Sequence, residues 1–518
     1  MNSDGLSYLD IASEALKVGP SELINGYWSP GYPALISVFL LVFNPAPAQE
    51  FPLLHFLNLC IFILTLWSFS TFLGRSLPTG EHKQYAIPFA FGTFIFFALK
   101  LIGVETVTPD LAVAAIIFLA AGIVVRMCQP GSSWKQYAGL GFVLALGYYL
   151  KAAMFPLSIV LLAILLITPG LSRIRLLVSC AMFLAVSAPL IIAISNRVGK
   201  PSFGETGRLN YAWFVGGLQP YSGWTGDASG ENGIPSHPQR QLMKTPRILE
   251  FAKPIKGTYA LWYDPSYWYE GAKIGFDLQK QIAAFKMTFR ELFGIDSKAG
   301  IYFSGALVLC VFIFREGLKG VWHQSQWWQL AWPVTALLMY TLVHVEGRFL
   351  GAFFVLLWLA VYSALIPRVA SNVAAAVCVT VLGAVLIPFA GELMLEAVDV
   401  FRQLPKPHEP EYQVVAQELT KLGLHPGDQL AVVGYAANAY YARYGRTRVV
   451  AELPDADQFW LLSSQELADV SQRLTAIGVR AIVARNGPET AVGAAWNDVR
   501  ISASQRYRIL LLPSGHHD

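Results

Sequence analysis

The sequence predicts a mainly α-helical, polytopic membrane protein with a small α/β domain at its C-terminal end. Of the 518 residues, 54% are hydrophobic and only 14% are charged, whereas soluble proteins carry roughly a quarter charged residues. Apolar runs recur between 51 and 389, and the longer ones reach the length of about 17–25 residues that crosses a hydrocarbon core of roughly 30 Å. From about residue 405 the sequence changes to short helix and strand patterns separated by polar turns.

Composition and short motifs narrow the classes of function. The net charge of +4 is small for this length and gives no reason to expect a nucleic-acid partner. The five cysteines lie in or beside apolar segments, so neither a disulfide framework nor a zinc cluster is expected. No N-x-Ser/Thr sequon occurs, which favours a bacterial plasma (inner) membrane over a membrane of the secretory pathway.

Hydropathy divides residues 51–389 into about ten predicted spans. Before them, 1–33 is polar, and the apolar piece 33–43 is too short to cross, so we expect an interfacial or re-entrant helix there. A large loop, 196–298, separates the early spans from the late ones. The spans are expected at about 51–73, 85–102, 111–125, 137–150, 152–167, 176–195, 300–314, 328–343, 349–366 and 372–389.

The basic residues predict which side of the membrane each loop occupies. Loops with clustered arginine and lysine alternate with loops that carry acidic and aromatic residues, as the positive-inside rule requires. A chain that starts outside without a signal sequence is unusual, so we expect a first span preceding Met1 to be absent from this sequence. The extracytoplasmic side is expected to hold 1–33, the turn 105–110, Lys151, the loop 196–298, the turn 344–348 and the C-terminal domain.

A proline-rich linker that begins at Pro405 separates a membrane domain, 1–404, from a C-terminal domain, 405–518. No G-x-G-x-x-G motif follows the strand that ends at Gly434, so nucleotide binding has no support. We interpret the domain as an accessory or docking unit rather than a catalytic one. Its expected elements are helices at 412–424 and 465–477 and strands at 430–434, 448–452 and 479–484.

Ionisable residues at the outer ends of the spans are candidates for chemistry, because charges at membrane depth are costly and point to function. Asp4 lies in the polar opening, Asp110 follows a proline at the start of a span, and Lys151 interrupts an apolar run. Two structural alternatives stay open: Asp110 could be a helix N-cap, and Lys151 could extend its ammonium to the interface from a helix end.

A second group of candidates lies in the sequence VHVEGRF between two predicted spans. His344, Glu346 and Arg348 are its polar members. A local ion pair between Glu346 and Arg348 that shapes the turn is the alternative to a binding role. Because all these residues share the expected outer side with the two aspartates, they indicate a site for an anionic headgroup with a carboxylate as general base.

The large loop contains a dense run of aromatic rings, WYDPSYWYE from Trp262 to Glu270. Aromatic faces stack on sugar C–H surfaces and carboxylates accept hydrogen bonds from sugar hydroxyls, so Trp262, Asp264, Trp268 and Glu270 are candidate substrate-binding residues. An aromatic belt at the membrane interface is the alternative. His237 with Asp264 or Glu270 could ligate a divalent cation, but no metal-ligand spacing supports it. A metal requirement therefore stays open, and no other cofactor is expected.

Taken in order over 1–366, these motifs resemble those of integral-membrane glycosyltransferases with the GT-C fold. The resemblance is to dolichyl-phosphate-mannose protein mannosyltransferases (family 39-like) and bacterial lipid A aminoarabinose transferases. In these families an acidic residue precedes a tyrosine and a small-residue helix, and a proline–tyrosine–proline turn follows. The matching residues here are Asp4-Gly5-Leu6-Ser7-Tyr8, Ile11-Ala12 and Pro30-Gly31-Tyr32-Pro33.

Later positions extend the resemblance. Asp110 matches a second acidic position, Lys151 a lysine after a pair of short spans, and residues 344–349 a late His/Glu-x-Arg-Tyr turn. Phe349 stands where tyrosine is more usual, and we expect the family's first span to be absent from this sequence.

The resemblance implies a cell-envelope glycosyltransferase, mannosyltransferase-like in its motifs. It would move a sugar from a polyprenyl-phosphate donor to a glycan, lipid or protein acceptor at the outer face of the bilayer. Asp4 and Asp110 would be catalytic, with Tyr8 fixing the opening segment. Lys151 and Arg348 would hold the departing lipid phosphate. Asp10 is the rival to Asp4 as general base, although it follows the tyrosine instead of preceding it.

Two other classes of function remain as alternatives. A transporter or flippase for a polyprenyl-linked or other amphiphilic anion should show internal repeats and broken helices near the midplane, and the sequence shows no convincing repeat. A non-enzymatic scaffold that presents the C-terminal domain would leave Asp4, Asp110 and Lys151 without a purpose.

Overall fold

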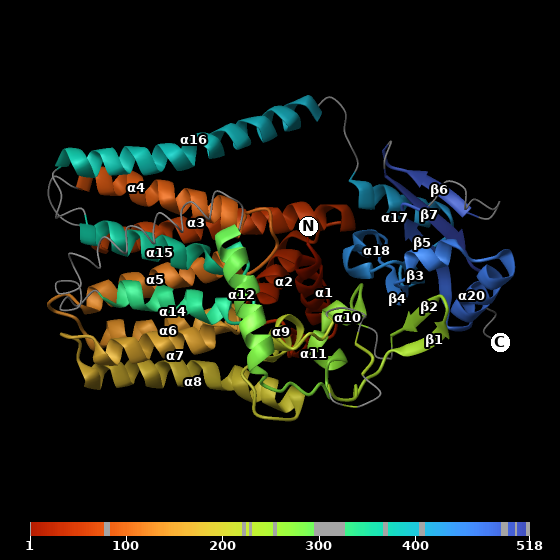
Figure 1. Ribbon diagram of the computed structural model, residues 1–518, viewed down its shortest axis with the longest axis horizontal. Coiled ribbons are helices and arrows are strands. Elements are labelled where there is room, and N and C mark those ends of the chain that lie inside the picture. Colours follow the sequence, from red (N-terminus) through yellow and green to blue (C-terminus); the bar gives the residue numbers. More distant parts are fainter. Residues whose placement is uncertain are drawn as a thin grey trace.

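The computed structural model is a long bundle of helices with a mixed β-sheet packed at one end (Figure 1). It confirms the predicted mainly helical, multi-pass architecture with a C-terminal α/β unit. The residues described are 2–76, 83–219, 224–226, 230, 232–251, 256–294, 327–365, 371–403, 410–487, 496–502 and 505–513.

The apolar helices follow the predicted spans closely. Four stretches of the described chain are long and apolar enough to cross a membrane: Pro47–Ser76, Lys83–Ile102, Asp110–Met127 and Arg173–Val198. The span expected at 300–314 lies outside the described residues. The helices are α3 Glu50–Ser76, α4 Lys83–Phe96 with a π-helical continuation η3 Phe97–Ile102, α5 Asp110–Met127, α6 Trp134–Leu150, α7 Met154–Ile167, α8 Arg173–Val198, α14 Trp328–Thr341, α15 Gly347–Leu365 and α16 Ser371–Gln403.

Helix α5 is the central element of the bundle, because 83% of its length is buried. Its sequence is rich in alanine, and small side chains let neighbouring helices approach closely. At Gly122 an added Cβ would lie only 3.3 Å from the Cα of Phe72 on α3. This tight packing fixes the position of Asp110, the first residue of α5.

Two short helices precede the spans. Helix α1, Ser3–Lys17, is buried along most of its length although it is partly polar, because it is covered by the bundle, the large loop and the C-terminal unit. Helix α2, Gly31–Phe43, fills the predicted interfacial segment. Between and after them lie the 3-10 turns η1 Pro20–Leu23 and η2 Pro47–Gln49.

The described part of the large loop forms helices and strands, and it joins the C-terminal sheet. Its strands β1 and β2 form one edge of a seven-stranded sheet in the described residues. The order of the strands is β1-β2-β4-β3-β5-β7-β6, and β3 pairs in parallel with β4 and β5. The loop elements are α9 Thr206–Phe214, β1 Arg240–Lys244, β2 Arg247–Glu250, α10 Ala260–Tyr263, α11 Pro265–Trp268 and α12 Leu278–Gly294.

The C-terminal unit has every helix and strand that the sequence predicts, and two further strands close its far edge. The two parallel strand pairs bury apolar residues on both sides, as continuous apolar runs do. The elements are α17 Glu411–Lys421, β3 Gln429–Val433, η6 Ala436–Asn438, α18 Tyr440–Tyr444, β4 Arg448–Leu453, α19 Ala456–Trp460, α20 Ser464–Ala476, β5 Val479–Arg485, β6 Trp496–Arg500 and β7 Arg506–Leu511.

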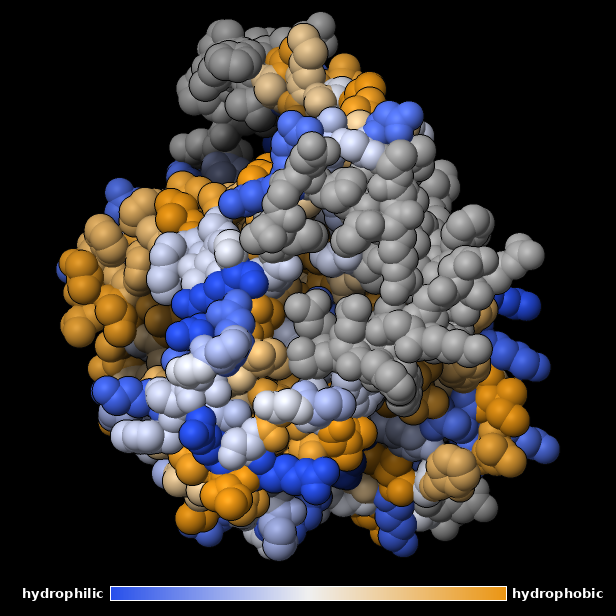
Figure 2. Space-filling model, turned by 90° about the vertical axis from the view of Figure 1, so that its left-hand side faces the viewer, coloured by the Kyte–Doolittle hydropathy of each residue, from blue (hydrophilic) through white to orange (hydrophobic). Residues whose placement is uncertain are grey.

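The two ends of the bundle differ in charge. Arg75, Arg126, Lys135 and Arg173 lie at the helix ends far from the sheet. Figure 2 looks at that end and shows hydrophilic residues on it and apolar residues at its flanks. The opening helix α1, the aromatic run and the sheet all lie at the opposite end (Figure 1). This separation agrees with the predicted sidedness, while the absolute orientation in a membrane stays a prediction.

Candidate functional site

A cavity of about 920 Å³ opens at the end of the bundle that carries α1. Its walls come from four segments that are far apart in sequence: the start of α1, the link between η3 and α5, the end of α12, and the turn between α14 and α15. The lining residues are Asn2, Ser3, Asp4, Leu101, Ile102, Thr106, Arg290, Glu291, His344, Val345, Glu346, Gly347 and Arg348.

Asp4 lies in the first turn of α1 and reaches this cavity. Gly5 permits the approach, because a Cβ there would lie 2.7 Å from the Cβ of Val107 in the segment before α5. The carboxylate accepts a hydrogen bond from Arg348 Nη2 at 2.8 Å and one from Trp262 Nε1 at 3.3 Å. About 17% of the Asp4 side chain stays exposed. This predicted catalytic residue is therefore fixed by two hydrogen bonds and is still accessible from the cavity.

Asp110 faces the same arginine from the other side. Its Oδ1 lies 2.5 Å from Lys151 Nζ, and its Oδ2 lies 3.8 Å from Arg348 Nε. The N-cap position of α5 belongs to Pro109, and the Asp110 side chain makes no capping bond. Only 3% of the side chain is exposed, so its charge is compensated by these cations and by the start of the helix.

Lys151 is placed by the break between α6 and α7. It adopts an extended conformation as the C-cap of α6, which turns its side chain toward Asp110. Its ammonium lies 3.6 Å from the centroid of the Phe349 ring, a cation–π contact that stabilises the charge in a partly dry site. Phe349, which stands where the resemblance leads us to expect a tyrosine, therefore packs against the lysine.

Arg348 joins three carboxylates. Besides Asp4 and Asp110 it bonds Glu346, so the local ion pair weighed from the sequence exists together with the long-range contacts. Burial alone would raise the pKa of Glu346, but the hydrogen bond from His344 and the Arg348 guanidinium lower it to about 2. Glu346 is thus anionic at neutral pH, and it holds the arginine in place.

His344 and Tyr8 complete the surroundings. The His344 ring stacks on Phe214 with centroids 3.7 Å apart, and its Nε2 lies 3.1 Å from Glu346. Tyr8, one turn after Asp4, is buried against Trp28 at 4.9 Å between ring centroids. Burial, and next the Asp4 carboxylate, raise the pKa of Tyr8 well above its usual value. The phenol therefore stays neutral and supports the position of α1.

Of the four candidate residues in the aromatic run, one contacts a site residue and the other three have partners elsewhere. Trp262 donates to Asp4, but Trp268 is buried and donates to the Ala260 carbonyl. Asp264 pairs with Arg197 at 3.0 Å. Glu270 is exposed and lies 2.9 Å from His237. These three stay predicted substrate-binding residues, although none of them lines the cavity.

No group of three or more His, Cys, Asp and Glu side chains with the geometry of a metal site occurs in the described part of the chain. The His237–Glu270 contact supplies two such groups, while Asp264 is engaged by Arg197. Asp4 and Asp110 both face cationic side chains. A divalent cation therefore has no residue set that the structure assigns to it.

The lining residues that were not predicted as site residues include Thr106, Arg290 and Glu291. The last two belong to α12, whose apolar side chains Phe285 and Phe289 recur at helical spacing. That amphipathic pattern was the available signal for a helix inside the loop. Nothing local indicates that this helix reaches the cavity, because the contact depends on the path of the whole loop.

Comparison with known proteins identifies the class of fold. No protein-family model matches the sequence, and no curated protein matches it. The structure of ArnT from Cupriavidus metallidurans bound to undecaprenyl phosphate matches with a TM-score of 0.52 and 11% identity, over 98% of this chain and 93% of that one. An Archaeoglobus fulgidus oligosaccharyltransferase, solved with Zn and sulfate, matches with a TM-score of 0.50 and 10% identity, over 93% of this chain and 64% of that one.

The fold that these matches define is the GT-C fold of membrane glycosyltransferases, extending over nearly the whole chain. This confirms the fold expected from the resemblance. At identities of only 11% and 10%, these structural matches establish the fold alone. The chemistry must therefore be argued from the side chains of this chain.

Proposed function

We propose that the protein is a membrane glycosyltransferase that takes a sugar from a polyprenyl-phosphate donor. The observation that carries this is the ion-paired cluster of Asp4, Asp110, Lys151 and Arg348. Asp4 and Arg348 of this cluster line the first cavity. The cluster combines an accessible carboxylate with two cations at the end of a membrane bundle. ArnT, which shares the fold, was solved with undecaprenyl phosphate. The acceptor would be a glycan, a lipid or a protein.

Each group in the cluster has a role in this chemistry. Asp4 would accept the proton of the acceptor hydroxyl or amine as that group attacks the anomeric carbon. The bond from this carbon to the phosphate oxygen then breaks, and the negative charge moves to the lipid phosphate. Arg348 and Lys151 would stabilise that charge. Asp110 and Glu346 would hold the two cations in position, since each contacts at least one of them.

A reconstituted assay tests the proposal. The purified protein in lipid nanodiscs is incubated with a panel of radiolabelled polyprenyl-phosphate sugars and a membrane fraction that contains acceptors. We expect one donor to be converted to polyprenyl phosphate with transfer of label to an acceptor. Conversion of none of the donors, together with movement of intact donor across a bilayer, would instead support the transporter or flippase alternative.

The cations should control use of the donor. We expect Lys151→Ala and Arg348→Ala to lower the rate at subsaturating donor by about one to two decades, because a charged, desolvated contact contributes roughly 1.5–3 kcal/mol. Steady-state kinetics with a fixed acceptor measure this. Lys421→Ala removes an exposed lysine of the C-terminal unit and serves as the control. Parental donor kinetics in both site variants would mean that these cations only shape the bundle.

The orientation follows from the same proposal, with the site and the C-terminal domain facing outward and the arginine-rich end in the cytoplasm of a bacterial inner membrane. A reporter fused after Leu511 should then be active only on the extracytoplasmic side, and one inserted at Gly131 only in the cytoplasm. Enzyme-reporter assays in cells measure this. The reverse pattern would move the cavity to the cytoplasmic face.

A further inference from the structure

A second cavity, of about 500 Å³, lies between α1, the α2–α3 junction and the C-terminal unit. Helix α1 separates it from the first cavity, since residues 2–4 line one and residues 10–17 line the other. The chemistry proposed above uses none of its residues. Those with charged or polar side chains are Asp10, Ser13, Glu14, Lys17, Asn44, Glu50, Thr258, Arg443, Arg446, Thr447 and Arg448.

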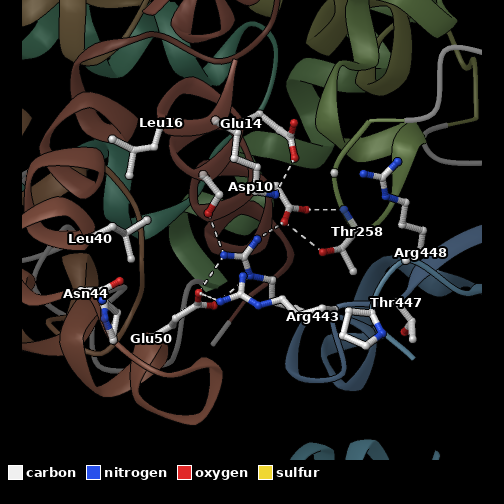
Figure 3. Close-up of a pocket in the computed structure, with 17 residues that line it drawn as sticks. Asp10, Glu14, Leu16, Leu40, Asn44, Glu50, Thr258, Arg443, Thr447 and Arg448 are labelled. Carbon is white, nitrogen blue, oxygen red and sulfur yellow. Dashed lines mark hydrogen bonds and ion pairs between the residues drawn. The ribbon is translucent and has the colours of Figure 1, made fainter. Parts of the chain in front are cut away.

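The deep wall of this cavity is a closed network. Arg443 of α18 bonds Glu50 through two nitrogens at 2.8 and 2.9 Å, Asp10 at 3.0 Å and Ser13 at 2.7 Å. Asp10 also accepts hydrogen bonds from the backbone and side chain of Thr258. Figure 3 shows the guanidinium lying between the two carboxylates. The buried charges of this wall therefore compensate one another, so that only groups at the rim of the cavity could bind a ligand.

The rim carries arginines whose positive charge is only partly compensated by carboxylates of the described residues. Arg446 bonds Glu50 but keeps 33% of its side chain exposed. Arg448 is exposed and has no carboxylate partner among the residues described, and no dashed line reaches it in Figure 3. Four cationic side chains and three carboxylates line the cavity. Arginine binds phosphate oxygens in its planar, multi-donor geometry, so this rim suits a phosphate anion.

The cavity opens beside a surface suited to lipid. On α2, Leu41, Val42 and Phe43 are 70%, 68% and 53% exposed. The Phe43 ring packs edge-on against Phe56 of the membrane span α3, with 6.2 Å between the ring centroids, and Phe56 is itself 48% exposed. The apolar face of α2 is therefore continuous with the outer surface of a span. Leu40 and Asn44, at the end of α2, line the cavity, so the cavity lies where this apolar surface ends.

From these two observations we infer that the second cavity binds the phosphate headgroup of an acidic phospholipid. Arg446 and Arg448 hold the phosphate, and the acyl chains lie along the exposed faces of α2 and α3. Juxtamembrane arginines beside an apolar surface attract anionic headgroups in this way. The bound lipid would seal the junction between α1 and the C-terminal unit.

Native mass spectrometry of the full chain, released from detergent, tests this inference. Phosphatidylglycerol is titrated in parallel with phosphatidylcholine and with inorganic phosphate. We expect phosphatidylglycerol to bind more tightly than phosphatidylcholine. We expect Arg446→Gln/Arg448→Gln to weaken its binding by at least about tenfold, since the double variant removes two of the positive charges that attract an anionic headgroup. Arg473→Gln, which alters an exposed arginine on α20, should bind as the parent does.

Several outcomes would overturn the inference. Equal binding of the two phospholipids would remove the role of charge. Unchanged phosphatidylglycerol binding by the double variant would place the lipid elsewhere. Inorganic phosphate that displaces phosphatidylglycerol at equal concentration would show that the acyl chains contribute nothing. Glutamine is shorter than arginine but keeps a polar, uncharged side chain, and the melting temperature of each variant shows whether it is folded.

Discussion

Replacement of Asp4 by asparagine is expected to lower sugar transfer by roughly two to four decades, the usual contribution of a positioned acid or base. Asparagine keeps the shape of the side chain, and its one oxygen can accept one of the two hydrogen bonds that Arg348 and Trp262 donate to the two oxygens of Asp4. It cannot take up the proton of the acceptor. Transfer rates of the purified variant under saturating donor and acceptor measure the effect.

Glu14→Gln is the matched control for this variant, because Glu14 lies on the same helix and pairs with the exposed Lys17. It should keep near-parental activity. The melting temperature of Asp4→Asn should stay close to that of the parent. Near-parental transfer by folded Asp4→Asn would remove the residue from the chemistry.

Replacement of Arg443 by alanine should destabilise the protein by about 3–5 kcal/mol, because it leaves Asp10 and Glu50 as buried charges without their main partner. Each of the two carboxylates has only 3% of its side chain exposed. The pairing joins α1 and α3 to the C-terminal unit, so its loss should also loosen α1. Denaturant unfolding in mild detergent measures the change.

Arg473→Ala provides the comparison, since its pair with Asp469 is about half exposed and exposed pairs contribute at most about 1 kcal/mol. The triple variant Arg443→Met/Asp10→Asn/Glu50→Gln removes all three charges and should be more stable than Arg443→Ala alone. A loss below about 1 kcal/mol for Arg443→Ala would contradict the account of this network.

Some features were predictable because their signal is local. A span is recognised by its own length and hydropathy, and the described apolar helices of the bundle accordingly lie where the sequence predicts spans. The grouping of Asp4, Asp110, Lys151 and Arg348 followed from shared sidedness, which depends only on counting spans. The structure brings these four together in one ion-paired cluster, of which Asp4 and Arg348 line the cavity.

Other features depend on contacts between distant segments, which one sequence does not reveal. That β2 of the large loop pairs with β4 of the C-terminal unit is one example. Asp10 is another: it was weighed as a rival base, but its partners Thr258 and Arg443 lie 248 and 433 residues away. With 3% of its side chain exposed and both oxygens bonded, Asp10 holds elements together in the structure. The assignment of the base to Asp4 stays a prediction.

The most direct test of the central claim is mass spectrometry of polyprenyl-linked sugars and surface glycans in cells. Three strains are compared: one without the gene, one with the parental gene and one with Asp4→Asn. We predict that a polyprenyl-phosphate sugar accumulates in the first and third strains while one surface glycan, lipid or protein lacks that sugar. Identical lipid-linked sugars and surface glycans in all three strains would contradict the assignment of this protein as a glycosyltransferase.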